Sequence, residues 1–112
     1  RICLVGSEMC IRDRFKIAEM HTKLEVARAY VDRCLELHLK KELDIPTAAA
    51  GKYYITDLQC EVIDECLQLH GGYGYMWEYP IARMFADSRV QRIYGGTNEI
   101  MKGIVAKAVL AD

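Results

Sequence analysis

The sequence has no excess of charge of either sign and no long apolar run. Its 112 residues include 15 basic and 16 acidic side chains, which are interspersed rather than gathered into one segment. This balance gives no basis for electrostatic capture of nucleic acid. A bilayer span needs an apolar run of about 18 residues, and a secretory signal needs a hydrophobic N-terminal stretch. The sequence contains neither, so we expect no membrane span. From the balanced charge we expect no nucleic-acid partner.

Proline is scarce, and the spacing of the five cysteines is uninformative. The two prolines leave long stretches in which a helix can continue without a break. The five cysteines form an odd count and have no zinc-like spacing, which favours a reducing compartment over a disulfide framework or a metal domain. A chain of this length fits one small domain, which buries roughly 65% of the surface of the unfolded chain.

The first fourteen residues, RICLVGSEMCIRDR, differ in residue pattern from the remainder of the chain. They carry two of the five cysteines and lack a sustained apolar period. They resemble a peptide produced when sequencing-adapter DNA is read through into an open reading frame. We therefore predict a non-native leader over residues 1–14 and a single helical domain over residues 15–112. The alternative, a native segment with a short strand or loop around Ile2–Val5, stays open. In either case no functional residue is assigned to residues 1–14.

Helical periodicity is clear from Phe15 onward. One apolar stripe recurs at steps of three and four residues: Met20, Leu24, Ala27, Val31, Cys34 and His38. This spacing predicts a helix over about Lys16–Lys40 with one face toward a core or a partner helix. Pro46 excludes a continuing helix and favours a new first turn. The short connection predicts that the next helix is antiparallel.

A second stripe predicts the next helix: Gly51, Ile55, Leu58, Val62, Cys66 and Leu69. It ends at Gly71-Gly72, where glycine can adopt the left-handed conformation that terminates a helix. Pro80 opens a shorter helix. Gly95-Gly96-Thr97 then breaks the chain before a last amphipathic helix, with Thr97 in the N-cap position. The predicted fold is all-α, an antiparallel helical bundle.

The glycine breaks are the candidate binding segments. Gly95-Gly96-Thr97 would present backbone N–H groups and a hydroxyl at the positive end of a helix, which suits a phosphate or pyrophosphate. The same turn is also explained as an ordinary helix cap, and both interpretations stay open. Gly72–Trp77 lacks the third glycine of the dinucleotide fingerprint and follows a helix, and the chain has no Gly-Lys-Ser/Thr of a P-loop.

Two pairs of cysteine and histidine are spaced as reactive groups could be. Cys34 and His38 share a helix face as a nucleophile and its base would, but both lie on the apolar stripe, so we interpret them as a packed core pair. Cys66 and His70 can meet, but two ligands without a third convergent group make a poor zinc site. A group of aromatic residues would stack on a flat ligand or cover a subunit contact: Tyr73, Tyr75, Trp77 and Tyr79.

Four ordered segments resemble the signature of acyl-CoA dehydrogenases: Gln68–Tyr75, Glu78–Pro80, Asp87–Arg89 and Ile93–Ile100. The resemblance covers about Phe15 to Leu110. It implies the C-terminal four-helix domain of a flavoprotein that oxidises a fatty acyl-CoA thioester to the trans-2-enoyl-CoA. In the complete enzyme of this family, a helical domain and a β-domain precede this one, so the chain is expected to be an inactive part.

The resemblance also implies roles for three sets of residues. Those expected to contact the FAD of a neighbouring subunit are Gln68, Leu69, His70, Gly71 and Gly72. Those expected to bind the subunit's own FAD are Thr97, Asn98, Glu99 and Ile100. Gly95 and Gly96 would border the acyl thioester. The implied partners are the acyl-CoA substrate, an electron-transfer flavoprotein, and further copies of the protein in a dimer or tetramer.

Gly95 departs from the commonest pattern of the family, in which medium- and short-chain members have a glutamate at this position. Removal of the α-proton requires a carboxylate, so the base is expected upstream, as in long-chain and isovaleryl-type members. Glu99 lies about 200° around the helix from the turn and is not expected to replace it. A branched-chain substrate and a non-catalytic helical interaction module are the alternatives. The implied location is the bacterial cytoplasm or the mitochondrial matrix.

Overall fold

The computed structural model describes residues 8–111, and their side chains from Ile11 onward. The strand or loop considered around Ile2–Val5 lies outside these residues. The helices are α1 (Glu8–Leu39), α2 (Ile45–Leu69), α3 (Pro80–Ser88) and α4 (Asn98–Leu110), and two 3-10 turns are η1 (Gly71–Tyr75) and η2 (Arg89–Arg92). The described part of the chain contains no strand, so the all-α prediction is confirmed.

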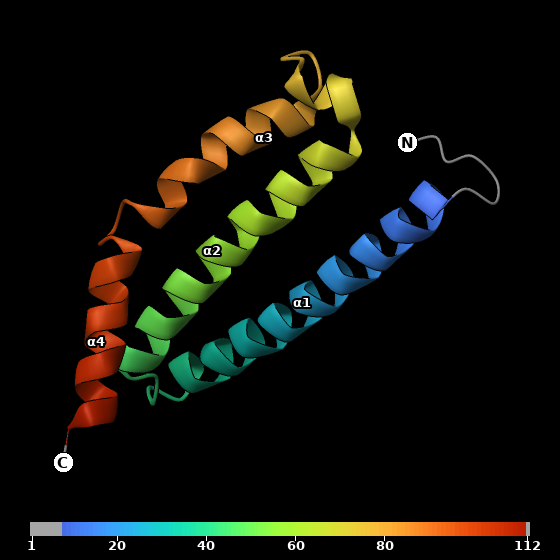
Figure 1. Cartoon of the computed structure of the whole chain (residues 1–112). Coiled ribbons are helices and arrows are strands. Elements are labelled where there is room, and N and C mark those ends of the chain that lie inside the picture. The colour runs from blue at the N-terminus through green and yellow to red at the C-terminus, as the bar shows by residue number, and fades with distance from the viewer. Residues whose placement is uncertain (1–7, 112) are drawn as a thin grey trace.

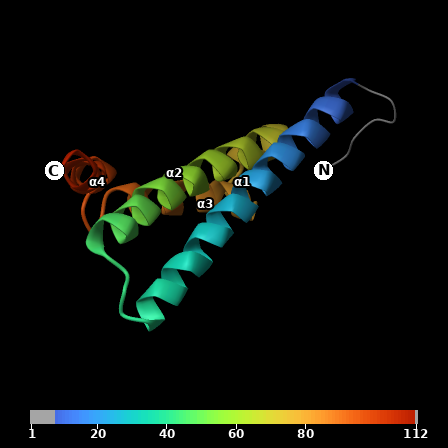
Figure 2. The same cartoon turned by 90° about the horizontal axis from the view of Figure 1, so that it is seen from below.

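Helix α2 is the central element of the fold. It lies between α1 on one side and α3 with α4 on the other, and it packs against all three (Figure 1). The α1–α2 pair forms the predicted antiparallel hairpin, and the two helices cross at an angle and separate toward their connecting loop (Figure 2). The buried apolar side chains of the described residues are Met20, Ala27, Ala49, Leu58 and Ile81.

Helix α1 differs from its prediction in length and in burial. It begins at Glu8 rather than near Lys16, because no glycine or proline interrupts residues 8–15 and a helix that has formed extends at low cost. The predicted stripe is buried at Met20 and Ala27, near the crossing with α2. His38 is exposed, so its interpretation as a packed core residue is wrong, because the hairpin separates near the loop.

The start of α2 is fixed by a cap that the sequence patterns did not single out. Asp44 has extended backbone angles, and its Oδ1 accepts a hydrogen bond from the Thr47 backbone N–H at 2.9 Å. Pro46 lies in the first turn, as expected for a residue without an N–H. At the other end, Gly71 has φ +62°, which confirms the left-handed termination that was predicted there.

Many large apolar side chains lie on the surface of the described residues, and Tyr75 is the most exposed of them, at 94%. Apolar surface on this scale is typical of a segment that packs against other parts of a longer protein or against another subunit. Within residues 8–111, none of the helices combines the length and the hydropathy that crossing a bilayer requires.

Candidate functional site

The second glycine break forms a tight turn between η2 and α4. Gly95 has φ +67° and Gly96 has φ +97°, both in the region that favours glycine. A Cβ added at Gly96 would collide with the Met101 methyl group, whereas a Cβ added at Gly95 would meet nothing within 4 Å. Both glycines are exposed. The turn therefore requires glycine for its backbone and leaves open space beside Gly95.

Thr97 is the N-cap of α4, as the sequence predicted. Its Oγ1 accepts a hydrogen bond from the Ile100 backbone N–H at 3.3 Å, which leaves the hydroxyl hydrogen able to donate elsewhere. The first amides of a helix lack an acceptor within that helix, so the N–H groups of Asn98 and Glu99 remain donors at the positive end of the helix dipole. These groups suit a phosphate or pyrophosphate.

The side chain of Asn98 turns away from this open end and into the fold. Only 4% of Asn98 is exposed. Its Nδ2 lies 2.8 Å from Asp57 Oδ1, 3.0 Å from Thr56 Oγ1 and 3.2 Å from the Tyr53 carbonyl oxygen, all on α2. The amide is thus committed to α2. A ligand at the start of α4 would contact the backbone N–H of Asn98 and not its side chain.

Lys52 connects the glycine turn to the middle of the fold. Its Nζ donates to the Gly96 carbonyl oxygen and to Asn98 Oδ1, each at 2.8 Å. The sequence patterns did not single out Lys52, although a signal is present. Lys52 and Thr56 are polar residues one turn apart, next to the apolar stripe of the same helix. Periodicity alone does not reveal that such residues meet a turn 44 residues away.

The first glycine break lies at the end of α2, where Gln68 and the His70–Gly72 backbone are exposed and Leu69 is half-buried. The contact that the His70 ring makes with Cys66 is to its backbone carbonyl. The ring Nδ1 lies 2.7 Å from the Cys66 carbonyl oxygen, so it helps to close the end of the helix. Gly74 in η1 is buried against α2.

The two glycine breaks do not form one site within this chain. The second break is attached to α2 at Lys52, and the first break begins at Gln68. At about 1.5 Å per residue, about 24 Å of helix axis lie between these two positions. Residues 68–72 and residues 95–100 are therefore separate surfaces. The first lies at the C-terminal end of α2, and the second lies beside the N-terminal part of α2 (Figure 1).

The remaining candidate groups are the Cys34–His38 pair, the aromatic residues that follow Gly72, and possible metal ligands. Cys34 and His38 line an apolar groove of about 350 Å³ between α1 and α2. Tyr73 and Tyr79 stack on each other, with their ring centroids 5.1 Å apart, while Tyr75 extends into solvent. No group of three or more histidine, cysteine, aspartate or glutamate side chains in the described residues is arranged to hold a metal ion.

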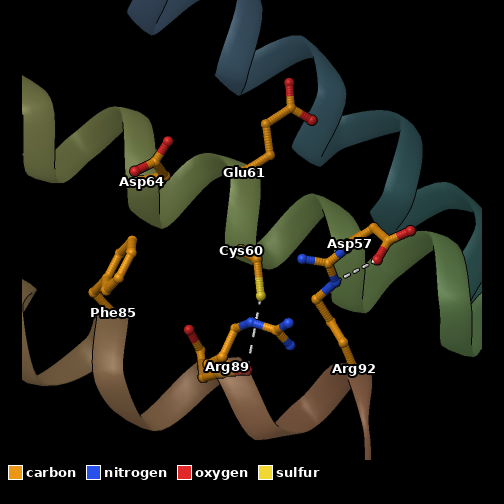
Figure 3. A pocket seen from close by; sticks show the side chains of 8 residues that line it. Asp57, Cys60, Glu61, Asp64, Phe85, Arg89 and Arg92 are labelled. Atoms are coloured by element: carbon orange, nitrogen blue, oxygen red, sulfur yellow. Dashed lines mark hydrogen bonds and ion pairs between the residues drawn. The ribbon is translucent and has the colours of Figure 1, made fainter. Parts of the chain in front are cut away.

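A pocket of about 450 Å³ lies between α2 and the α3–η2 segment, and Figure 3 shows its side chains. The Arg92 Nε donates to Asp57 Oδ1 at 2.7 Å across it, and Cys60 Sγ lies 3.8 Å from the Ser88 carbonyl oxygen. Its lining mixes carboxylates and guanidinium groups: Asp57, Glu61, Asp64, Arg89 and Arg92. The mixture of signs favours no ligand charge.

Comparisons with known proteins agree with the arrangement of the helices. Residues 13–110 match the family model described as acyl-CoA dehydrogenase, C-terminal domain. The mitochondrial long-chain specific acyl-CoA dehydrogenase of Mus musculus is 56% identical over 97 residues, which are 87% of this chain and 23% of that protein. The chain thus spans about a quarter of the length of this relative.

Two solved structures give the same picture. The acyl-CoA dehydrogenase of Geobacillus kaustophilus superposes with a TM-score of 0.89 at 38% identity, covering 98% of this chain and 29% of that one. The butyryl-CoA dehydrogenase of Megasphaera elsdenii gives a TM-score of 0.89 at 32% identity, with the same coverage of 98% and 29%. By the family model, the identity to relatives and the fold, this chain belongs to the acyl-CoA dehydrogenase family, of which it contains the C-terminal domain.

Proposed function

We propose that the complete protein is an FAD-dependent acyl-CoA dehydrogenase that oxidises a long-chain fatty acyl-CoA to the trans-2-enoyl-CoA. The observation that carries the proposal is the turn at Gly95–Asn98. It combines exposed glycines in left-handed conformations with free amides at the start of a helix, and hydrogen bonds of the Lys52 and Asn98 side chains attach it to α2. The 56% identity to a long-chain specific relative supports the choice of substrate.

The residues of the turn fit one end of an FAD. The N–H groups of Asn98 and Glu99 and the Thr97 hydroxyl are donors for a pyrophosphate, and Ile100 offers an exposed apolar side chain. When bound, FAD supplies the acceptor for the hydride that leaves the β-carbon of the substrate. The open space at Gly95 and the exposed Gly96 backbone would border the thioester.

Gln68, Leu69, His70, Gly71 and Gly72 are proposed to contact the FAD of a neighbouring subunit. The separation of about 24 Å along α2 supports this assignment, because the two glycine breaks then serve different FAD molecules. Tyr75 and Trp77, which are exposed beside this segment, supply the apolar surface that a subunit contact needs. We therefore expect a dimer or tetramer.

The base that removes the α-proton is proposed to lie upstream of this chain. Gly95 has no side chain, and Glu99 sits in the first turn of α4 as one of the flavin-contacting residues of this proposal. An electron-transfer flavoprotein is the proposed electron acceptor. The mitochondrial relative in Mus musculus supports the mitochondrial matrix for a eukaryotic source, and the cytoplasm is proposed for a bacterial source.

The test is to express the complete coding sequence and record flavin absorption before and after adding a long-chain acyl-CoA. We expect a yellow protein whose flavin band bleaches on addition of the thioester. A colourless, unresponsive protein would favour a non-catalytic helical interaction module. Faster turnover of branched-chain than of straight long-chain thioesters would leave the family intact and reject the proposed substrate.

A further inference from the structure

Lys52 is the one described side chain whose charged group contacts the Gly95–Thr97 turn. Both of its hydrogen bonds, to the Gly96 carbonyl oxygen and to Asn98 Oδ1, are 2.8 Å long. Hydrogen bonds with a charged donor are about twice as strong as neutral ones. The ammonium group therefore fixes two points on either side of Thr97, one on the backbone and one on a buried side chain.

The position of the Gly96 carbonyl sets the direction of the next amide. A trans peptide group holds its C=O and the following N–H nearly antiparallel in one plane, and the described residues contain no cis peptide bond. Since the Gly96 carbonyl points at Lys52 on α2, the Thr97 N–H points away from α2. Lys52 thereby directs a backbone donor toward the exposed side of the turn.

Asn98 holds the ammonium group in place from the other side. Its Oδ1 accepts from Lys52 while its Nδ2 donates to Asp57 Oδ1 at 2.8 Å, so the amide links a cation and a carboxylate of the same helix. A side chain with both ends engaged and only 4% exposed has little freedom to rotate. The Lys52 position is therefore set by the fold and does not depend on a ligand.

We propose that Lys52 is a positioning residue of the flavin site, which acts by holding the Gly96 carbonyl so that the Thr97 N–H faces the cofactor. The inference rests on the proposed function, because it assigns a task within the same site. Lys52 itself makes no contact with the cofactor and acts through the backbone of the turn. Its loss should weaken cofactor binding through the orientation of the turn, without removing any donor from it.

The test uses the complete protein with three substitutions. Lys52→Met keeps the aliphatic length and removes the ammonium group, Lys52→Arg keeps the charge, and Lys102→Met is the matched control. The Lys102 Nζ lies 5.6 Å from the centroid of the ring of Tyr53, the residue that follows Lys52, but Lys102 belongs to α4 beyond the turn. For each purified variant, the dissociation constant of FAD is measured by flavin fluorescence, and the absorption band of the bound flavin is recorded.

We expect Lys52→Met to raise the dissociation constant of FAD about tenfold, equivalent to about 1.4 kcal/mol, and to shift the flavin band. Lys52→Arg should recover most of the affinity, and Lys102→Met should stay within about twofold of the unmodified protein. Thermal unfolding of the FAD-free forms separates affinity from stability. A lower unfolding temperature with unchanged affinity and spectrum in the folded fraction would overturn the proposal.

Lys52→Arg carries the proposal if Lys52→Met does not fold. A dissociation constant between two- and fivefold above that of the unmodified protein, with a shifted band, would support a positioning role. Affinity and spectrum of Lys52→Arg equal to those of the unmodified protein would in that case reject it. Absence of flavin from the unmodified protein is a different result, because it rejects the proposed function and the positioning role with it.

Discussion

The Arg92 Nε donates to Asp57 Oδ1 at 2.7 Å, and the same oxygen accepts from Asn98 Nδ2 at 2.8 Å. One carboxylate oxygen of α2 thus holds both η2 and the first residue of α4. The Arg92 and Asp57 side chains are 40% and 33% exposed, so solvent screens the attraction between their charges. The effect of this contact is mainly geometric, because it fixes the two ends of the segment that contains the glycine turn.

Replacing Asp57 with alanine should release that segment. We expect Asp57→Ala to lower the free energy of unfolding by about 1–2 kcal/mol, since it removes the acceptor of a buried amide and of a half-exposed guanidinium. Urea unfolding of the chain, followed by helical circular dichroism, measures the change. Asp64→Ala is the control, because Asp64 is an exposed carboxylate that lines the same pocket. Equal effects of the two substitutions would contradict the role of Asp57.

The two long helices were predictable because their apolar residues recur at steps of three and four residues. The helix boundaries were predictable because Pro46 and Thr97 have the preferences of helix starts and Gly71 that of a helix stop, and all three occur where expected. The start of α1 at Glu8 was not predictable from the sequence. Residues 8–15 contain neither a glycine or proline that would mark a helix boundary nor a clear apolar period.

The polar contacts of the candidate site were not predictable from the same patterns. Lys52 and Gly96 are 44 residues apart, and their contact depends on how α2 and α4 are rotated about their axes. A period shows which face of a helix is apolar, but not which polar residue at the edge of that face meets another element. The sequence therefore indicated the turn through its glycines and missed the lysine that holds it.

A close approach in η1 gives a second stability prediction. A Cβ added at Gly74 would lie far inside van der Waals contact with the Leu67 carbonyl oxygen, which is backbone and cannot move aside alone. We expect Gly74→Ala to destabilise the chain by about 1–3 kcal/mol, the usual range for overpacking. Gly72→Ala is the matched control, because a Cβ there would meet nothing within 4 Å. A similar urea midpoint for both variants would refute the contact.

The cap at Asp44 predicts a pH dependence. Thr47 lowers the pKa of Asp44 below its usual 3.8, first through its side chain and then through its backbone N–H, which donates to Asp44 Oδ1 at 2.9 Å. A lowered folded-state pKa stabilises the fold above the unfolded pKa, and this contribution is lost as the pH falls through the folded pKa. The cap should therefore weaken below about pH 4.

Asp44→Asn separates this effect from the titration of other carboxylates, because asparagine caps a helix without a charge. The unfolding temperature of the unmodified chain should exceed that of Asp44→Asn at pH 7, and the difference should shrink between about pH 4 and pH 2. The other acidic residues titrate in both proteins and cancel in the comparison. A difference that does not change with pH would show that the charge of Asp44 contributes nothing to the cap.

Gly96→Glu tests the site itself. Gly96 has φ +97°, so a glutamate there strains the backbone and adds a negative charge where the cofactor and thioester are proposed to approach. We expect the complete protein with this change to lose flavin content and thioester affinity together. Gly96→Ala, with the same strain and no charge, isolates the electrostatic part and should retain more flavin than Gly96→Glu. Unchanged flavin content and unchanged thioester affinity in Gly96→Glu would place the site elsewhere, because a carboxylate beside Thr97 cannot be neutral toward a bound pyrophosphate.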